Sequence, residues 1–198
     1  MAPSKKSADT TRRAVFLDRD GVLNKVNLED GKPASPTKIE QFHLLPDLKK
    51  WLQFFKDKGL MVIVITNQPE VRRGLLKANE LEKMHLILRE KLPVDEIIVC
   101  PHDDRDGCEC RKPKPGMLYR AASRFGIDLQ GSFIIGDSWK DMEAGTAAGC
   151  RTILIDKPYN QGVKNDYRVK NIEEAVGVVK RCLDLPRERI TTERDERN

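Results

Sequence analysis

The chain has 198 residues, which suits one domain of ordinary size, and 39% of its residues are hydrophobic while 34% are charged. This balance supplies one core under a well-solvated surface, and no apolar run approaches the roughly 18–20 residues that cross a bilayer. The net charge of +5 favours anionic partners, such as phosphorylated small molecules or nucleic acid.

Both ends of the chain are rich in charge and offer little that a core would bury. We therefore expect disordered tails at residues 1–12 and 186–198, and one domain over residues 13–185. The first residues, MAPSKKSADTTRR, lack the apolar stretch of a secretory signal, so we expect a cytoplasmic protein. We see no apolar stripe for a partner and expect a monomer that contacts no membrane.

Short apolar runs alternate with amphipathic segments along the domain. The runs are rich in Val, Ile or Phe, as buried parallel strands are, and occupy residues 14–17, 61–65, 96–99, 132–135 and 151–155. Helices are expected at residues 46–58, 81–92, 117–125, 139–148 and 172–183. This alternation predicts an α/β fold with a doubly wound, mostly parallel sheet, whose ligands bind at the carboxyl ends of the strands.

Two of these helices carry signals at their ends. Pro46 suits the first turn of the first helix, and Gly59 suits its C-terminal stop. Asn79 and Glu82 resemble a capping pair at the start of the second helix.

The first polar motif follows the first strand directly, in the segment VFLDRDGVLN. Asp18 and Asp20 lie two residues apart, and Gly21 permits a sharp turn of the backbone. Two carboxylates this close repel each other unless a cation or a proton lies between them, and Mg²⁺ is the hard cation that prefers oxygen ligands. Taken alone, the motif fits a solvated turn equally well.

Two further polar motifs end later strands. Thr66, Asn67 and Gln68 end the second strand, where hydroxyl and main-chain amide groups can hold phosphate oxygens. Asp137 ends the fourth strand and is predicted to be another ligand of the cation. Asp141 fits a helix cap slightly better than a role in supporting the metal.

The segment CRKPKPGM is a basic loop that prolines stiffen. Pro113 and Pro115 restrict the backbone, so the heads of Arg111 and Lys112 are presented in place. Close to the aspartates, Lys112 would offset charge on a transferred phosphoryl group. A guanidinium binds phosphate with two hydrogen bonds, so Arg111 would recognise substrate. A solvated basic loop explains the segment about as well when it is viewed alone.

Three of the five cysteines cluster, which in a cytosolic protein points to metal rather than to disulfides. Cys100 and His102, followed by Cys108 and Cys110, form the Cys3His set of a tetrahedral zinc site. Four protein ligands leave no open position, so this zinc is predicted to be structural and to hold the neighbouring basic loop. The two other cysteines are predicted to be small buried hydrophobes, Cys150 and Cys182.

The polar motifs, taken together and in order, resemble the four signature motifs of the haloacid dehalogenase (HAD) superfamily. They cover about residues 15–155 and rest on Asp18 with Asp20, Thr66, Lys112 and Asp137. The C-x-H and C-x-C pairs that run into RKPKPGM look like one branch of it, which holds D-glycero-D-manno-heptose 1,7-bisphosphate phosphatases and histidinol phosphatases. The resemblance implies a fold without a large cap domain.

This resemblance implies magnesium-dependent hydrolysis of a phosphomonoester. Asp18 would attack phosphorus and become an aspartyl phosphate, and Asp20 would act as acid and then as base. The magnesium ligands would be Asp18, Asp137 and the main-chain carbonyl of Asp20. Thr66 and Lys112 would bind the phosphoryl oxygens. The expected substrate contacts are Asn67, Gln68 and Arg111.

The substrate class is less constrained than the chemistry. A sugar bisphosphate such as D-glycero-D-manno-heptose 1,7-bisphosphate is implied, with histidinol phosphate, a nucleic-acid 3′ end, or binding of phosphosugars without catalysis as alternatives. Aromatic residues make up only 6% and form no stripe with basic ones, which speaks against nucleic acid. Pro69 and Glu70 replace the Ser-Gly pair that is frequent in the branch, and residues 25–36 also differ.

Overall fold

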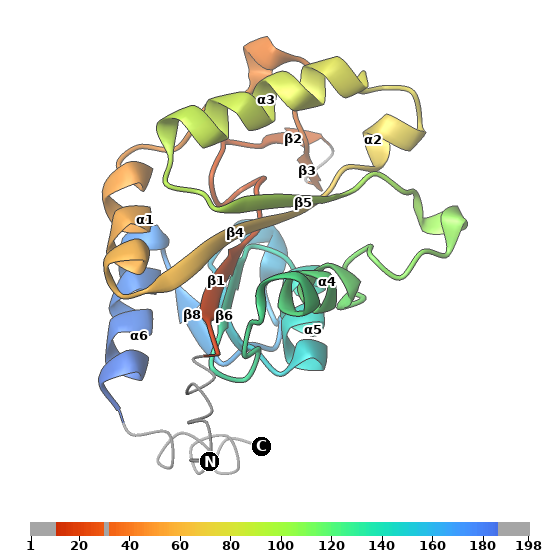
Figure 1. The fold of residues 1–198 in the computed structure, drawn as a ribbon. Helices are drawn as coiled ribbons and strands as arrows, with labels where there is room; N and C mark the ends of the chain where they lie inside the picture. Colours follow the sequence, from red (N-terminus) through yellow and green to blue (C-terminus); the bar gives the residue numbers. More distant parts are fainter. Residues whose placement is uncertain (1–10, 30–31, 186–198) are drawn as a thin grey trace, which may run out of the picture.

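The structure is a computed structural model that describes residues 11–29 and 32–185. Its centre is a six-stranded sheet in the order β5-β4-β1-β6-β7-β8, in which every neighbouring pair is parallel (Figure 1). In chain order the strands are β1 (Arg13–Leu17), β4 (Leu60–Asn67), β5 (Glu96–Cys100), β6 (Phe133–Gly136), β7 (Arg151–Ile155) and β8 (Tyr167–Val169). The predicted fold class is confirmed.

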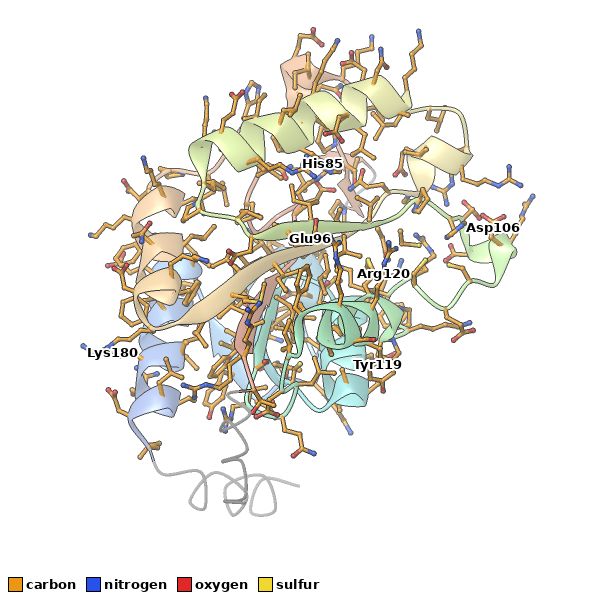
Figure 2. All side chains as sticks on the ribbon, viewed as in Figure 1. His85, Glu96, Asp106, Tyr119, Arg120 and Lys180 are labelled. Carbon is orange, nitrogen blue, oxygen red and sulfur yellow. The ribbon has the colours of Figure 1, made fainter. Side chains whose placement is uncertain are left out.

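Helices cover both faces of this sheet. One hydrophobic cluster contains the inner residues of α1 (Leu48–Asp57), α3 (Ala78–Lys91) and α6 (Ile172–Asp184), and the other contains those of α4 (Gly116–Phe125) and α5 (Trp139–Ala148). Figure 2 shows charged side chains, such as Lys180 on α6, on the outer surfaces of the helices. Strands that are buried on both faces read as continuous apolar runs, which is why the sequence revealed five of the six.

The shorter elements lie at the carboxyl ends of the strands or beside them. Within the described residues, the segments between the sheet and its helices contain only small structures, and none has the size of a cap domain. They are the antiparallel hairpin of β2 (Asn27–Glu29) and β3 (Lys32–Ala34), α2 (Pro69–Arg72), and the 3-10 turns η1 (Ile39–Gln41), η2 (Asp104–Asp106) and η3 (Pro158–Asn160). The sequence analysis did not predict these elements or β8.

Two predicted helix starts are wrong. Helix α1 begins at Leu48 after Asp47, whose φ of 58° is left-handed, so Pro46 precedes the helix and its cap. Helix α3 begins at Ala78, and Asn79 therefore lies inside the first turn and not at the cap. Glu82 pairs with Arg89 at 3.0 Å instead of capping.

Arg12, which we expected in the N-terminal tail, is bound to the segment that follows α4. Main-chain hydrogen bonds join Arg12 to Gly126 (3.1 Å) and to Asp128 (2.8 Å). Residues 1–10 and 186–198, which make up most of the two predicted tails, lie outside the described residues. None of the helices in the described part of the chain is long and apolar enough to span a membrane.

Candidate active site

The polar motifs meet at the carboxyl edge of the three central strands. Asp18 follows β1, Thr66 lies near the end of β4, and Asp137 follows β6. Because β1 lies between β4 and β6 in a parallel sheet, these three strand ends are adjacent. Lys112 reaches the same place from the loop between β5 and α4, and its ammonium group lies 2.9 Å from the Asp18 carboxylate.

Lys112 is a buried cation at this edge, with only 2% of its surface exposed. Its Nζ donates to Asp141 Oδ1 at 2.5 Å and to the carbonyl oxygen of Ile65 at 3.0 Å, in addition to its contact with Asp18. Burial alone lowers the pKa of this amine, but Asp141 and Asp18 outweigh that effect and raise the pKa above its usual range. Lys112 is therefore charged beside the proposed nucleophile.

Asn67 holds the loop that carries this lysine. Its Nδ2 donates to the carbonyl oxygen of Lys112 at 3.0 Å, and its Oδ1 accepts from the Lys112 main-chain N–H at 3.1 Å. Both polar groups of the side chain are thus engaged, and the amide that we expected to contact substrate joins β4 to the basic loop.

Three carboxylates, two of them buried and that of Asp18 partly exposed, form a candidate cation site. Oxygen atoms of Asp18, Asp137 and Asp141 all lie within 4.8 Å of one another. Burial and then repulsion from Asp141 raise the pKa of Asp18, and the same two causes raise the pKa of Asp137 to about 7. A divalent cation with oxygen ligands would relieve this repulsion, so the donor set fits Mg²⁺.

Asp141 has two roles at this site. Its Oδ2 accepts from the main-chain N–H of Ser138 at 3.1 Å and from the Ser138 hydroxyl at 2.6 Å, so the predicted helix cap is present. Its Oδ1 binds Lys112. The third carboxylate of the cluster is therefore that of Asp141, for which the sequence analysis slightly preferred the cap over a role in supporting the metal.

The Asp20 side chain faces away from that cluster toward four donors. Its Oδ1 accepts from Arg19 Nε (3.1 Å) and Asn24 Nδ2 (2.9 Å), and its Oδ2 accepts from Arg19 Nη2 (3.0 Å) and Gln68 Nε2 (2.8 Å). Burial alone raises the pKa of this carboxyl, but Arg19 and the hydrogen bonds outweigh it and lower the pKa. The Asp20 carboxylate is thus occupied, so only its main-chain carbonyl remains a predicted magnesium ligand.

Gln68 links this group to Thr66. Its Nε2 donates to Asp20 Oδ2 and also to Thr66 Oγ1, each at 2.8 Å. As the acceptor, the Thr66 hydroxyl keeps its own hydrogen for a phosphate oxygen. Gln68, which we expected to bind substrate, has its amide nitrogen engaged in holding two other residues of the site.

Asp137 is held by residues that the sequence analysis missed. The Tyr159 hydroxyl donates to Asp137 Oδ2, and Asn160 Nδ2 donates to the Asp137 carbonyl oxygen at 2.9 Å. On the other side, a Cβ added to Gly21 would lie 1.8 Å from Oδ2, and the φ of Gly21 is +81°. Only glycine therefore fits at this position of the first motif.

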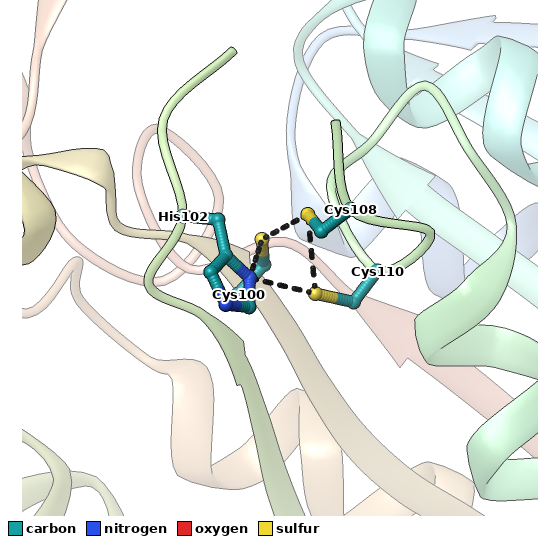
Figure 3. Close-up of side chains that lie close together, drawn as sticks. All are labelled: Cys100, His102, Cys108 and Cys110. Atoms are coloured by element: carbon teal, nitrogen blue, oxygen red, sulfur yellow. Dashed lines mark hydrogen bonds between the residues drawn. The ribbon is translucent and has the colours of Figure 1, made fainter. Parts of the chain in front are cut away.

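Cys100, His102, Cys108 and Cys110 converge as predicted (Figure 3). Cys100 Sγ lies 3.6 Å from Cys108 Sγ, and His102 Nδ1 lies 3.7 Å and 3.2 Å from the sulfurs of Cys100 and Cys110. A tetrahedral zinc ion with ordinary bond lengths places such ligand atoms roughly 3.5–3.8 Å apart. The four residues therefore fit zinc, and Cys150 and Cys182 are buried elsewhere.

The loop between the candidate zinc ligands His102 and Cys108 binds three arginines through its own aspartates. Asp103 pairs with Arg73, and Asp106 pairs with Arg72 at 3.2 Å. Asp104 Oδ1 accepts from Arg111 Nε at 2.6 Å, although the Asp104 side chain is 71% exposed. Figure 2 shows that Asp106 lies on a part of this loop that projects beyond the sheet. Most of the basic charge near the site is therefore paired within the protein.

Three comparisons relate this chain to known proteins. A family model described as HAD-hydrolase-like matches residues 109–179. A D-glycero-beta-D-manno-heptose-1,7-bisphosphate 7-phosphatase of Pseudomonas aeruginosa is 37% identical over 150 residues, which are 73% of this chain and 82% of that protein. A D-glycero-alpha-D-manno-heptose-1,7-bisphosphate 7-phosphatase of Campylobacter jejuni is 35% identical over 176 residues, which are 85% and 96% of the two chains.

A solved structure gives the same relationship. The crystal structure of D,D-heptose 1,7-bisphosphate phosphatase from B. bronchiseptica, complexed with magnesium and phosphate, matches with a TM-score of 0.74 at 28% sequence identity. The match covers 85% of this chain and 98% of that one. The similarity therefore spans nearly the whole of the related protein.

Proposed function

The chain belongs to the D-glycero-D-manno-heptose-1,7-bisphosphate 7-phosphatase family of HAD-like hydrolases, and from this premise we propose that it removes one phosphate from a sugar bisphosphate of that kind. It is a phosphatase, as its relatives are. The observation that carries the proposal is the buried Lys112 ammonium between Asp18 and Asp141, beside Asp137. This arrangement offers a nucleophile, a cation site and a positive charge at one strand edge.

The proposed reaction has two steps. In the first, an Asp18 oxygen forms a bond to phosphorus while the ester bond breaks, and the leaving oxygen takes a proton from Asp20. Asp20 must enter this step protonated, although Arg19 and its hydrogen bonds favour the carboxylate in the free protein. In the second, water attacks phosphorus and gives a proton to Asp20, the bond between phosphorus and the Asp18 oxygen breaks, and inorganic phosphate leaves with the Asp18 carboxylate restored. Lys112 and Arg19 N–H both contact Asp18 Oδ1, so we propose Oδ2 as the attacking oxygen.

Charge on the phosphoryl group is balanced by the surrounding residues. Lys112 and the Thr66 hydroxyl would bind its oxygens, which favours a transition state richer in charge than the ground state. Asp18 and Asp137 would hold Mg²⁺ with the Asp20 carbonyl oxygen. The bound ion would neutralise developing negative charge on the phosphoryl oxygens.

The second phosphate of the substrate is assigned to Arg111. The Arg111 side chain is only about a tenth exposed, and it pairs with the exposed carboxylate of Asp104. A phosphate group can replace Asp104 as the partner of Arg111. The named relatives differ in the anomer that they act on, so both anomers belong in the test. The monomeric state and the cytoplasmic location remain predictions.

A substrate panel with a nucleophile variant tests this function. Phosphate release is measured with Mg²⁺ for both heptose 1,7-bisphosphate anomers, hexose monophosphates, histidinol phosphate and a DNA 3′-phosphate. We expect a heptose bisphosphate to give the highest kcat/KM, and D18N to lose activity by at least about a thousandfold because no nucleophile remains. Preference for histidinol phosphate or DNA would replace the proposed substrate, and steady turnover by D18N would remove Asp18 from its role.

A further inference from the structure

Asp137 offers two oxygens to its surroundings, and one of them is enclosed. Oδ2 lies between the Tyr159 hydroxyl, which donates to it, and the backbone of Gly21. The hypothetical Cβ of Gly21 lies 3.3 Å from the Tyr159 hydroxyl as well, so a larger residue at position 21 would crowd both groups. The other oxygen, Oδ1, is therefore the one left to face a cation.

The tyrosine belongs to a turn that is itself fixed in place. Tyr159 lies in η3, which follows β7, and β7 is the neighbour of β6, the strand that ends just before Asp137. Asn160 in the same turn donates to the carbonyl oxygens of Asp137 (2.9 Å) and Ile155 (2.8 Å). Arg168 on β8 donates to Asn160 Oδ1 at 3.1 Å and to the Asn160 carbonyl oxygen at 3.2 Å. The turn thus holds both the main chain and the side chain of Asp137.

We propose that Tyr159 is a positioning residue that sets the orientation of the Asp137 carboxylate and so presents Oδ1 to the magnesium ion. The inference rests on the proposed function, because it takes Asp137 as a magnesium ligand. A hydrogen bond from a second residue already restricts the orientation of a ligating carboxylate, so less conformational entropy is lost when the carboxylate binds the ion. None of the four signature motifs contains Tyr159, so this contact extends the site to a fifth segment of the chain.

Tyr159→Phe removes the donor and keeps the ring. Partners of this kind typically contribute a factor of 10–100 to metal affinity, so we expect the Kd for Mg²⁺, measured by calorimetry without substrate, to rise about tenfold. The Mg²⁺ concentration for half-maximal phosphate release is expected to rise by the same factor. At saturating Mg²⁺, kcat is expected to stay within about twofold of the parent value, because Tyr159 acts through Asp137.

Tyr119→Phe is the matched control. The Tyr119 hydroxyl also donates one hydrogen bond, to the carbonyl oxygen of Ala147 at 3.0 Å, but it lies on the outside of α4 (Figure 2). We expect this variant to bind Mg²⁺ as the parent does, and thermal melts of both variants show whether either loses stability.

An unchanged or lowered Mg²⁺ Kd in Tyr159→Phe overturns the inference, as does a raised Kd that Tyr119→Phe shares. Failure of the proposed function has a different signature. In that case the parent protein itself would bind no Mg²⁺ at the site or release no phosphate from any substrate of the panel.

Discussion

Among the residues that the structure describes, Arg19 is the largest fully buried side chain, and it donates two hydrogen bonds to Asp20. Its guanidinium also lies 5.5 Å from the centre of the Phe42 ring. A planar fork with two parallel donors fixes the plane of a carboxylate, which a lysine ammonium does not do. We therefore expect Arg19 to orient Asp20 for proton transfer.

Arg19→Lys keeps the charge and removes the fork. We expect kcat/KM for a sugar phosphate to fall about 10- to 100-fold, because its alkoxide leaving group needs the proton from Asp20. For p-nitrophenyl phosphate, whose leaving group needs no proton, kcat/KM should change by less than about threefold. Phosphate release from both substrates is the measurement.

Arg151→Lys is the matched control for this variant. The Arg151 guanidinium also lies near an aromatic ring, 5.4 Å from the centre of the Phe133 ring. Arg151 is the first residue of β7, at the end of the strand away from the site. We expect it to leave both rates unchanged. An equal loss on both substrates in Arg19→Lys would mean that Arg19 serves folding and not the orientation of Asp20.

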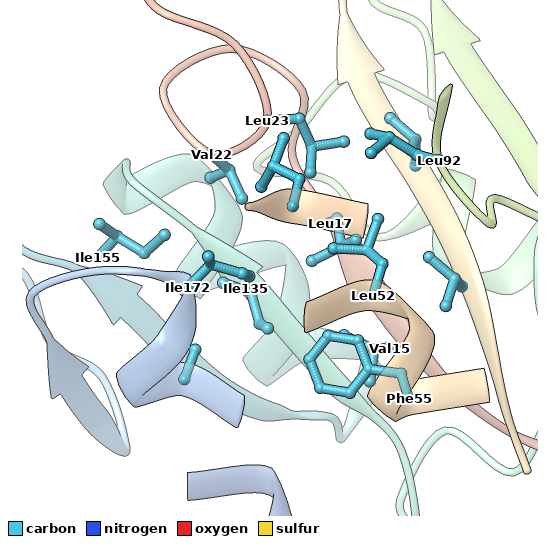
Figure 4. Close-up of a cluster of buried hydrophobic side chains, with 14 of the residues drawn as sticks. Val15, Leu17, Val22, Leu23, Leu52, Phe55, Leu92, Ile135, Ile155 and Ile172 are labelled. Carbon is cyan, nitrogen blue, oxygen red and sulfur yellow. The ribbon is translucent and has the colours of Figure 1, made fainter. Parts of the chain in front are cut away.

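At the level of elements, the pattern of apolar residues in β1 and α1 explains which side chains each element buries. Figure 4 shows Val15 and Leu17 of β1 against Leu52 and Phe55 of α1. The alternate residues of β1 pack in the other cluster with α4 and α5. A strand that is apolar at every position feeds both layers, which explains why its sequence is a continuous run.

Helix α3 carries a titratable group on its buried face. His85 is 3% exposed, and it lies with Leu81, Met84 and Leu88 on the inner side of the helix (Figure 2). Burial, and then the positive charges of Arg19 and Arg89, lower the pKa of His85 to about 4. The imidazole is thus neutral in the folded protein at neutral pH.

His85 makes the stability of the fold depend on pH. A lowered folded-state pKa means that the unfolded chain binds the proton more readily, so stability is lost as pH falls from about 6.5 towards 4. The largest possible loss for this shift is about 3 kcal/mol. We expect urea unfolding at pH 7 and at pH 4.5 to show a smaller difference for His85→Gln than for the parent.

His43→Gln is the control for the pH experiment, because it removes an exposed imidazole. We expect this variant to keep the full difference between the two pH values. If His85→Gln keeps it as well, the pH dependence belongs to other groups.

At the scale of the whole molecule, the loop from Cys100 to Cys110 connects two other segments beside the active site. Its aspartates pair with Arg72 and Arg73 of the α2 segment and with Arg111 of the basic loop. Ion pairs with an exposed partner are individually weak. Their geometry therefore depends on the backbone of the loop, which a zinc ion bound to the four candidate ligands would hold in place. Loss of zinc should therefore weaken the pairing of Arg72, Arg73 and Arg111 with the aspartates of this loop.

Cys108→Ser tests this connection. We expect metal analysis to find about one zinc per chain in the parent and clearly less in the variant, because one tetrahedral site has four ligands. We expect KM for the bisphosphate to rise at least about tenfold, with a lower melting temperature, since Arg111 loses its support. Cys182→Ala removes a buried thiol outside the loop and should keep both the zinc and the KM. Full zinc content in Cys108→Ser would contradict the ligand assignment.

The sequence by itself determined the order of the motifs, the strands that they end, and the four residues that converge as candidate zinc ligands. Each of these depends on short-range patterns. Parallel strands bring their carboxyl ends to a common edge of the sheet, where the motifs meet. The C-x-H and C-x-C pairs each hold two metal-binding side chains close together. For this reason Asp18, Thr66, Lys112 and Asp137 could be assigned to one site without a structure.

Only the tertiary structure decided which partner each of these groups has. Asp20 faces Arg19 and Gln68 instead of the acidic cluster, Asp141 joins that cluster, and Tyr159 holds Asp137 from 22 residues away. These contacts depend on how separate segments pack, and no spacing in the chain records them. A hydrogen bond between side chains forms or fails over less than an ångström, so it follows from the packed arrangement and not from the order of the residues.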